Sequence, residues 1–176
     1  MAHVAFLRGV NVGGHRTFRP TALVQQLHRY DVVNIGAAGT FVVRARTSQT
    51  RLRAELARRL PFETAVILCT GQELLDIAGG ELFGGERVGP GVVRFVSVLA
   101  RRPRLVPSLP MQFPDQGRWL LKILTIENRF VFGQYRRHMK AIGYLGSIDR
   151  IFGVPATTRN WNTITAIVGV LRTRAS

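Results

Sequence analysis

The order of short apolar runs and helical patterns across residues 4–70 constrains the fold of this chain more than any other feature. Residues 4–7 form an uninterrupted apolar run, and apolar residues at helical spacing follow from Pro20. Two further apolar runs, residues 32–35 and 41–43, flank a turn with two glycines and predict a β-hairpin. The chain is therefore expected to begin with a strand, a helix and two paired strands.

A second helix and a fourth strand complete this pattern. Ser48 is a suitable N-cap for a helix that ends at Pro61 and carries an apolar stripe of Leu52, Leu56 and Leu60. Residues 65–68 are entirely apolar, which predicts a strand at the centre of a sheet. The resulting order is that of a split βαβ arrangement, so we predict an α+β fold with a ferredoxin-like N-terminal lobe.

The length of 176 residues suits one domain or two small lobes. We assign the ferredoxin-like lobe to residues 1–78 and a glycine-rich connector to residues 79–91. A smaller second α+β lobe is expected over residues 92–176.

The second lobe is expected to begin with a strand over residues 92–99 and to end with a helix over residues 160–172. A second hairpin is expected between them, at residues 119–125 and 130–135. Four prolines predict an irregular chain over residues 103–114.

The glycine-rich segment after the first apolar run is the first candidate ligand site. Successive backbone N–H groups in such a turn can bind an anion, and an arginine beside them adds a fixed positive charge. The candidate residues are Arg8, Gly9, Asn11, Gly13 and Gly14. The alternative is a strand-to-helix connection that binds no ligand.

A polar segment at the last predicted helix is the second candidate site. Arg159 precedes the helix, and Asn160, Asn162 and Thr163 lie at its start. A helix N-terminus exposes unpaired N–H groups and a partial positive charge, which suits a phosphate or a carboxylate. Two alternatives stay open: one residue only caps the helix, or the segment forms a polar network that joins the lobes. If the segment binds a ligand, we expect it to converge with the glycine-rich segment on one site.

Three motifs resemble those of a known family. Residues 7–14, Leu-Arg-Gly-Val-Asn-Val-Gly-Gly, and residues 158–163, Thr-Arg-Asn-Trp-Asn-Thr, are similar to the terminal signatures of a bacterial family of unknown function, DUF1697. Residues 39–43 resemble its Ser-Gly-Asn-Val-Val-Phe segment in part, with Ala38 and Thr40 in place of the usual serine and asparagine. The resemblance implies an α+β fold with ferredoxin-like halves and leaves the activity undefined.

The charge of the chain favours an anionic partner. It has 25 Lys and Arg residues against 10 Asp and Glu residues, a formal net charge of +15, and Lys122 and Lys140 are its only lysines. Our leading hypothesis is an anion-binding protein whose partner is nucleic acid, another polyanion or a small anionic ligand such as a nucleotide. This hypothesis also rests on three arginine clusters, namely Arg58-Arg59, Arg101-Arg102-Arg104 and Arg136-Arg137. A GC-rich genome also favours arginine over lysine, but it does not explain the scarcity of acids.

Signatures of catalysis are mostly missing from the sequence. It contains neither a complete phosphate-binding loop nor a dinucleotide fingerprint, and Cys69 ends an apolar run, as expected of a buried thiol. The four histidines lack the spacing of metal ligands; they are His3, His15, His28 and His138. We therefore expect no metal and no cofactor, and we identify no catalytic residue. The alternative hypothesis is an enzyme that acts on a small phosphorylated or carboxylated substrate at the interface of the two lobes.

Phe6 and Phe41 lie on the first and third predicted strands, where RNA-recognition domains of this topology carry aromatic rings that stack on bases. We expect both rings to pack in the core instead, because phenylalanine is usually buried.

The sequence predicts a cytoplasmic protein. Its apolar runs are far shorter than the roughly 18 residues of a membrane span, and its first residues lack the basic region of a signal peptide. We expect no membrane partner, and the sequence leaves the oligomeric state open.

Overall fold

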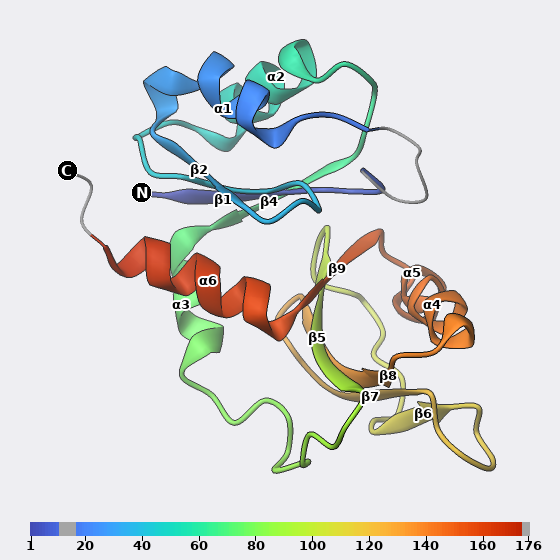
Figure 1. Ribbon diagram of the computed structural model, residues 1–176. Coiled ribbons are helices and arrows are strands. Elements are labelled where there is room, and N and C mark those ends of the chain that lie inside the picture. Colours follow the sequence, from blue (N-terminus) through green and yellow to red (C-terminus); the bar gives the residue numbers. More distant parts are fainter. Residues whose placement is uncertain (11–16, 174–176) are drawn as a thin grey trace. The chain divides into compact units, whose positions relative to one another are not determined.

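The computed structural model describes residues 1–10 and 17–173, and it divides the chain into two compact units (Figure 1). The first unit comprises Met1–Ala78 and Thr163–Ser176, and the second comprises Gly79–Asn162. A boundary after residue 78 agrees with the prediction. The chain beyond Asn162, which we had assigned to the second lobe, returns to the first unit.

Contacts within each unit explain where the chain changes unit. Phe83, in the predicted connector, packs edge-on against Phe132 with 5.8 Å between ring centroids, so residues 79–91 are anchored in the second unit. Near the C-terminus, Leu171 packs closely against Gly71 of the first unit. A Cβ atom added at Gly71 would lie only 2.9 Å from the Cδ2 atom of Leu171. A glycine-rich composition therefore does not make residues 79–91 a free linker.

The first unit has the predicted ferredoxin-like arrangement. Its elements are β1 (His3–Leu7), α1 (Pro20–Gln26), the 3-10 helix η1 (His28–Tyr30), β2 (Val32–Ile35), β3 (Thr40–Val43), α2 (Gln49–Arg59), β4 (Val66–Thr70) and α3 (Gly71–Ala78). The strands are antiparallel and stand in the order β2-β3-β1-β4. The α+β class and the split βαβ topology are both confirmed.

The predicted central place of the fourth strand is wrong, because β4 lies at an edge of this sheet. Among the described strands it pairs with β1, with Leu68 opposite Ala5. Its apolar sequence has another cause: successive side chains point to opposite faces, and Leu68 and Cys69 are both buried. A continuous apolar run here indicates burial of both faces of the strand and not its place in the sheet.

The core of the first unit lies between one face of this sheet and the helices α1 and α2 (Figure 1). Phe41 belongs to this core, and Phe6 is also fully buried. The expectation that both rings pack internally is therefore confirmed. The buried leucines on the two helices are Leu23, Leu52 and Leu56.

Ser48 caps α2 as predicted. Its Oγ atom accepts a hydrogen bond from the backbone N–H of Arg51, with 3.1 Å between the two atoms. We expect Ser48→Ala to lower the free energy of unfolding by about 1 kcal/mol, because that N–H loses its partner. Chemical denaturation measures the change, and Ser48→Asp is the control because aspartate caps equally well. Equal losses for both variants would contradict a capping role.

The second unit is built on a five-stranded antiparallel sheet. Its elements are β5 (Val92–Leu99), β6 (Met111–Phe113), β7 (Leu121–Glu127), β8 (Phe130–Arg136), α4 (Met139–Leu145), α5 (Ile148–Phe152) and β9 (Ala156–Asn160). The strands stand in the order β6-β7-β8-β5-β9. The helix α6 (Trp161–Arg172) follows and leads the chain into the first unit. The predicted strand over residues 92–99 and the second hairpin are confirmed.

Four elements of the second unit were not predicted, namely β6, α4, α5 and β9. The polar residues of β9 resemble a helix cap in sequence, but they pair with β5, and the hydroxyl oxygens of Ser97 and Thr158 lie 2.6 Å apart. The short edge strand β6 fits between Pro110 and Pro114 because proline is tolerated at the ends of edge strands.

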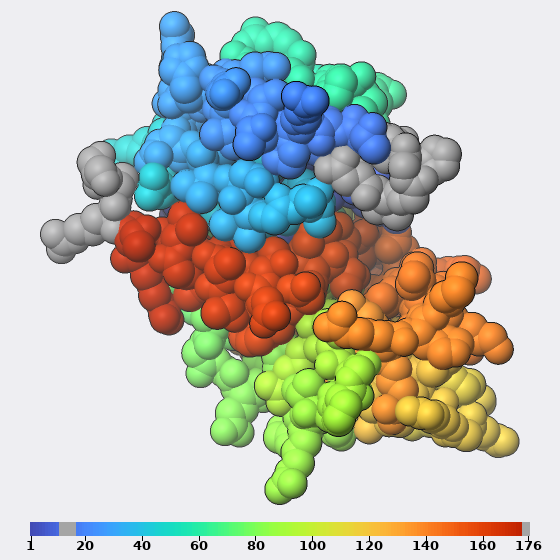
Figure 2. Space-filling view, in the orientation of Figure 1, coloured from blue at the N-terminus to red at the C-terminus, as the bar shows by residue number. Residues whose placement is uncertain are grey.

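The two short helices have different roles in the second unit. α5 buries Ile148 and Phe152 in a core that the strands complete with Phe95, Leu99, Leu121, Ile123 and Val131. α4 instead leaves Met139 and Ile142 exposed, and the orange segment that contains it lies at the surface in Figure 2. Apolar residues therefore occur on both the buried and the exposed sides of α4, so its sequence does not show a single apolar face.

Candidate functional site

The structure describes the first two residues of the predicted glycine-rich site. Arg8 follows β1, its N–H donates to the carbonyl oxygen of Ala65 at 3.0 Å, and its carbonyl accepts from the Thr64 hydroxyl at 2.6 Å. Gly9 adopts a φ of +69°, which requires glycine or strain. Both residues line a hollow of about 660 Å³ in the first unit, together with Glu63 and Thr64. Asn11, Gly13 and Gly14 lie outside the described residues.

Arg159 precedes α6, which begins at Trp161, but it lies within the strand β9. Its side chain is only 7% exposed. Its Nη1 atom donates to the hydroxyl of Thr157 at 2.7 Å and to the carbonyl of Thr158 at 2.9 Å. Burial lowers the pKa of Arg159 to about 10, so the guanidinium stays charged at neutral pH. We therefore assign Arg159 to the packing of β9 and not to a surface anion site.

The other residues of the C-terminal signature lie where β9 passes into α6. Asn160 ends the strand, and Asn160 and Asn162 are exposed and line a hollow of about 290 Å³ in the second unit. Thr163 is half-buried in the first turn of α6. The two signature segments thus line separate hollows, one in each unit, and their convergence on a single site stays a prediction.

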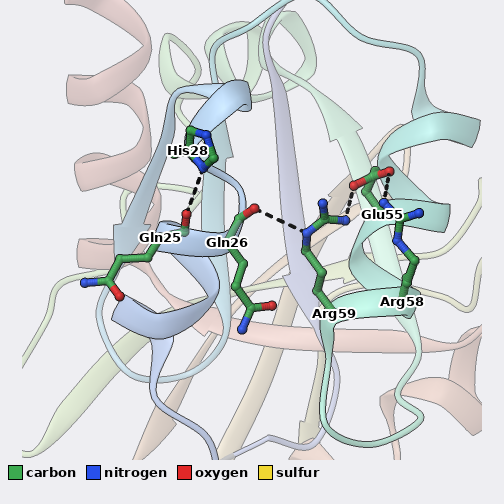
Figure 3. Close-up of polar contacts among 6 residues, drawn as sticks. All are labelled: Gln25, Gln26, His28, Glu55, Arg58 and Arg59. Carbon is green, nitrogen blue, oxygen red and sulfur yellow. Dashed lines mark hydrogen bonds and ion pairs between the residues drawn. The ribbon is translucent and has the colours of Figure 1, made fainter.

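The first arginine cluster is engaged by a carboxylate. Arg58 and Arg59 both form ion pairs with Glu55, one turn earlier on α2 (Figure 3). Arg59 also donates from Nε to the carbonyl of Gln26 at 3.2 Å, which ties α2 to α1. This cluster contributes to the structure of the first unit and is a poor candidate for binding an anion.

The second arginine cluster is only partly engaged. The guanidinium of Arg136 lies 4.1 Å from the ring centroid of Trp119, and its Nε donates to the carbonyl of that tryptophan at 2.8 Å. This stacking and hydrogen bond hold Arg136 against β7 and β8. Its neighbour Arg137 is exposed and lines the same hollow as Asn160 and Asn162.

The third arginine cluster opens onto a hollow of its own. Arg101 and Arg104 follow β5, and the structure adds Arg150 of α5; the three side chains are exposed and line a space of about 570 Å³. Within residues 1–10 and 17–173, no carboxylate or carbonyl pairs with any of these guanidinium groups. Leu105, 84% exposed, lies beside them.

The backbone around this third hollow is well held. The N–H of Ala100 donates to the carbonyl of Pro155 at 2.8 Å, so the end of β5 is tied to the start of β9. Gly153 ends α5 with a φ of +66°, and the N–H of Val154 donates to the carbonyl of Asp149 at 3.1 Å. These bonds bring Arg150 next to a cluster almost 50 positions earlier in the chain. Sequence reasoning missed Arg150 because no local pattern indicates that proximity.

Two absences apply to the part of the chain that the structure describes. None of its helices combines the length and the apolar character needed to cross a membrane. It also contains no group of three or more His, Cys, Asp or Glu side chains placed to hold a metal ion.

Comparisons with known proteins support the family resemblance and the α+β fold. The family model described as "Protein of unknown function (DUF1697)" matches residues 1–103. The structure of conserved bacterial protein SP0830 from Streptococcus pneumoniae is similar, with a TM-score of 0.62 over 97% of this chain and 98% of that chain. The two sequences are 14% identical, so the likeness shows a common fold alone. A search of curated proteins gave no match.

Proposed function

The chain belongs to the DUF1697 family, and we propose that it binds nucleic acid through its phosphate groups at the hollow lined by Arg101, Arg104 and Arg150. The observation that carries the proposal is the gathering of these three guanidinium groups, each without a partner among the described residues, around one hollow. No reaction is proposed.

The electrostatics of the hollow favour an anionic ligand. Like charges held close together repel, and a bound anion removes that repulsion. Arg58 and Arg59 differ in this respect, because both of their guanidinium groups pair with the carboxylate of Glu55. Around the third hollow, no carboxylate of the described residues pairs with Arg101, Arg104 or Arg150.

The geometry of the ligand groups also favours phosphate. Arginine presents a planar fork of N–H donors that matches the oxygens of a phosphate, and it stays charged at any physiological pH. A space of about 570 Å³ has room for more than one phosphate group, as a nucleic-acid backbone requires. The net charge of +15 adds a long-range attraction for polyanions.

The test is a binding titration at several salt concentrations. Fluorescence anisotropy with a labelled, mixed-sequence single strand of about 20 nucleotides is expected to give saturable binding at 50 mM salt. Three phosphate contacts predict a slope of log K against log salt of about −2, since each contact contributes about −0.7 on a single strand. The same titration with the duplex and with an RNA strand of the same sequence shows which form of nucleic acid the protein prefers.

Vesicles of phosphatidylserine and phosphatidylcholine, assayed by sedimentation, are the comparison surface. Phosphate groups at a lipid surface would also attract arginine, so vesicles separate nucleic-acid binding from general attraction to anions. Absence of oligonucleotide binding at low salt, binding that does not respond to salt, or tighter binding to the vesicles would each contradict the proposal.

A further inference from the structure

A second hollow lies at the start of β5, and its lining residues differ from those of the hollow beyond the end of β5. Its lining combines two arginines, two asparagines, a tryptophan and three valines: Arg94, Arg137, Asn160, Asn162, Trp161, Val88, Val92 and Val93. From this lining we propose that the hollow binds a mononucleotide, with the arginines on the phosphate and the indole, valines and amides on the base. The proposal does not depend on nucleic-acid binding at Arg101, Arg104 and Arg150.

Arg94 supplies a positive charge that is fixed in place. Its guanidinium carbon lies 4.8 Å from the ring centroid of Phe83, and its Nη2 atom donates to the backbone carbonyl of Glu86 at 2.6 Å. The carboxylate of Glu86 pairs with Lys122, 3.5 Å from its Nζ atom. The Nε of Arg94 is buried and has no hydrogen-bond partner. Arg94 therefore brings to the hollow a guanidinium that is held in place by its own contacts and that attracts an anion.

Arg137 supplies a second, accessible charge to the same hollow. Its backbone N–H donates to the carbonyl of Gly91 at 2.8 Å, which places it beside the start of β5. Its exposed side chain makes no ion pair with another residue in the described part of the chain. Two guanidinium groups around one space, with no acid among the lining residues, favour an anion there.

Trp161 and the valines give the hollow an apolar wall. The indole is half-buried and held edge-on by Phe83, at 5.2 Å between ring centroids, and by Phe132, at 6.4 Å. Because its position is fixed by these contacts, little conformational entropy is lost when a flat ring packs against it. Val88 is 50% exposed and extends the apolar surface.

Asn160 and Asn162 favour a base over a simple aromatic ring. An amide carries donors and an acceptor, and it can pair with the edge of a purine such as adenine. A volume of about 290 Å³ is at the lower end of ligand sites, which span roughly 300–1,000 Å³. It therefore suits one nucleotide and not a folded or double-stranded segment.

The fluorescence of Trp161 provides a readout specific to this hollow. The chain has two tryptophans, so Trp119→Phe leaves Trp161 alone while keeping an aromatic ring under Arg136 and Lys122. We expect adenosine 5′-monophosphate to change this fluorescence in a saturable way. Adenosine, inorganic phosphate and benzoate should each bind at least tenfold more weakly, because each lacks either the charge or the base.

Variants in the same background separate the two proposed sites. Arg137→Ala should weaken the binding of adenosine monophosphate at least tenfold. Asn162→Ala should weaken the binding of adenosine monophosphate but leave the binding of benzoate unchanged. The combined Arg101→Ala and Arg104→Ala changes should leave the affinity for adenosine monophosphate unchanged. Calorimetry on the wild-type chain gives the same comparison of ligands if Trp119→Phe impairs folding.

Four results would overturn the proposal: no fluorescence or calorimetric response to the nucleotide, equal affinity for adenosine, equal affinity for benzoate, or unchanged binding by Arg137→Ala. Loss of nucleotide binding upon the Arg101 and Arg104 changes would place that ligand in the other hollow. Failure of oligonucleotide binding alone would contradict the proposed function and not this site.

Discussion

Replacing Gly133 by alanine is expected to lower the free energy of unfolding by about 3 kcal/mol or more. Gly133 lies on β8, between Phe95 of β5 and Ile123 of β7. A Cβ atom at this position would collide with the backbone carbonyl oxygen of Lys122 and lie 2.6 Å from the Cζ atom of Phe95. Phe95 is fully buried and the other obstacle is backbone, so neither can move without displacing a strand.

Gly143→Ala is the matched control for this change. Gly143 lies inside α4 of the same unit, and a Cβ atom there would meet no heavy atom within 4 Å beyond its chain neighbours and the backbone of its own helix. Alanine is favoured over glycine in a helix, so this variant should gain about 0.5–1 kcal/mol. Urea denaturation followed by circular dichroism compares the two variants. A Gly133→Ala protein as stable as the wild type would show that β5, β8 and β7 do not pair in this register.

The first unit could be predicted from sequence because its elements follow one another in short, locally recognisable segments. The run at residues 4–7, the hairpin and the cap at Ser48 each carry their own pattern. The position of β4 at the sheet edge carries no such pattern. Strand order depends on pairing between distant segments, and an apolar strand looks the same at an edge when both of its faces are buried.

The second unit was harder to predict because tertiary contacts override its local preferences. Residues 156–160 consist largely of threonine and asparagine, which favour helix caps, yet pairing with β5 makes them a strand. The bond between Ser97 and Thr158 lies across that pairing and joins residues 61 positions apart. On α4, the exposed Met139 and Ile142 place apolar residues on the solvent side, so the sequence pattern does not separate a buried face from an exposed one.

The candidate sites were only partly predictable for a similar reason. In the sequence, Arg58-Arg59, Arg101-Arg102-Arg104 and Arg136-Arg137 are three equivalent basic runs. In the structure, Glu55 pairs with Arg58 and Arg59, and Trp119 stacks on Arg136 but not on Arg137. A run of charges shows how much charge is present, but only the folded chain shows which charges are left for a ligand. Arg159 illustrates the same limit, because its burial in β9 and its hydrogen bond to Thr157 can be seen only in the folded chain.

Replacing Arg101, Arg104 and Arg150 together by alanine is expected to weaken oligonucleotide binding by roughly 10²–10³-fold at low salt. Each hydrogen bond from a charged group contributes about 1.5 kcal/mol to the binding free energy, or somewhat less when the group is exposed. Every 1.4 kcal/mol of binding free energy corresponds to a tenfold change in affinity. The slope of log K against log salt should fall by about 2 units, because three phosphate contacts are removed from a single strand. The three side chains are exposed, so the melting temperature should change little.

The control for this variant removes the same charge elsewhere. Arg19, Arg29 and Arg51 are exposed residues of the first unit, and their replacement by alanine lowers the net charge by the same three units. General attraction by the basic surface depends on total charge and would be weakened equally by both triple variants. A site made of specific contacts is weakened only by the loss of Arg101, Arg104 and Arg150. Equal losses of affinity in the two variants would therefore reduce the proposed site to nonspecific charge, whereas a difference of tenfold or more would locate binding at this hollow.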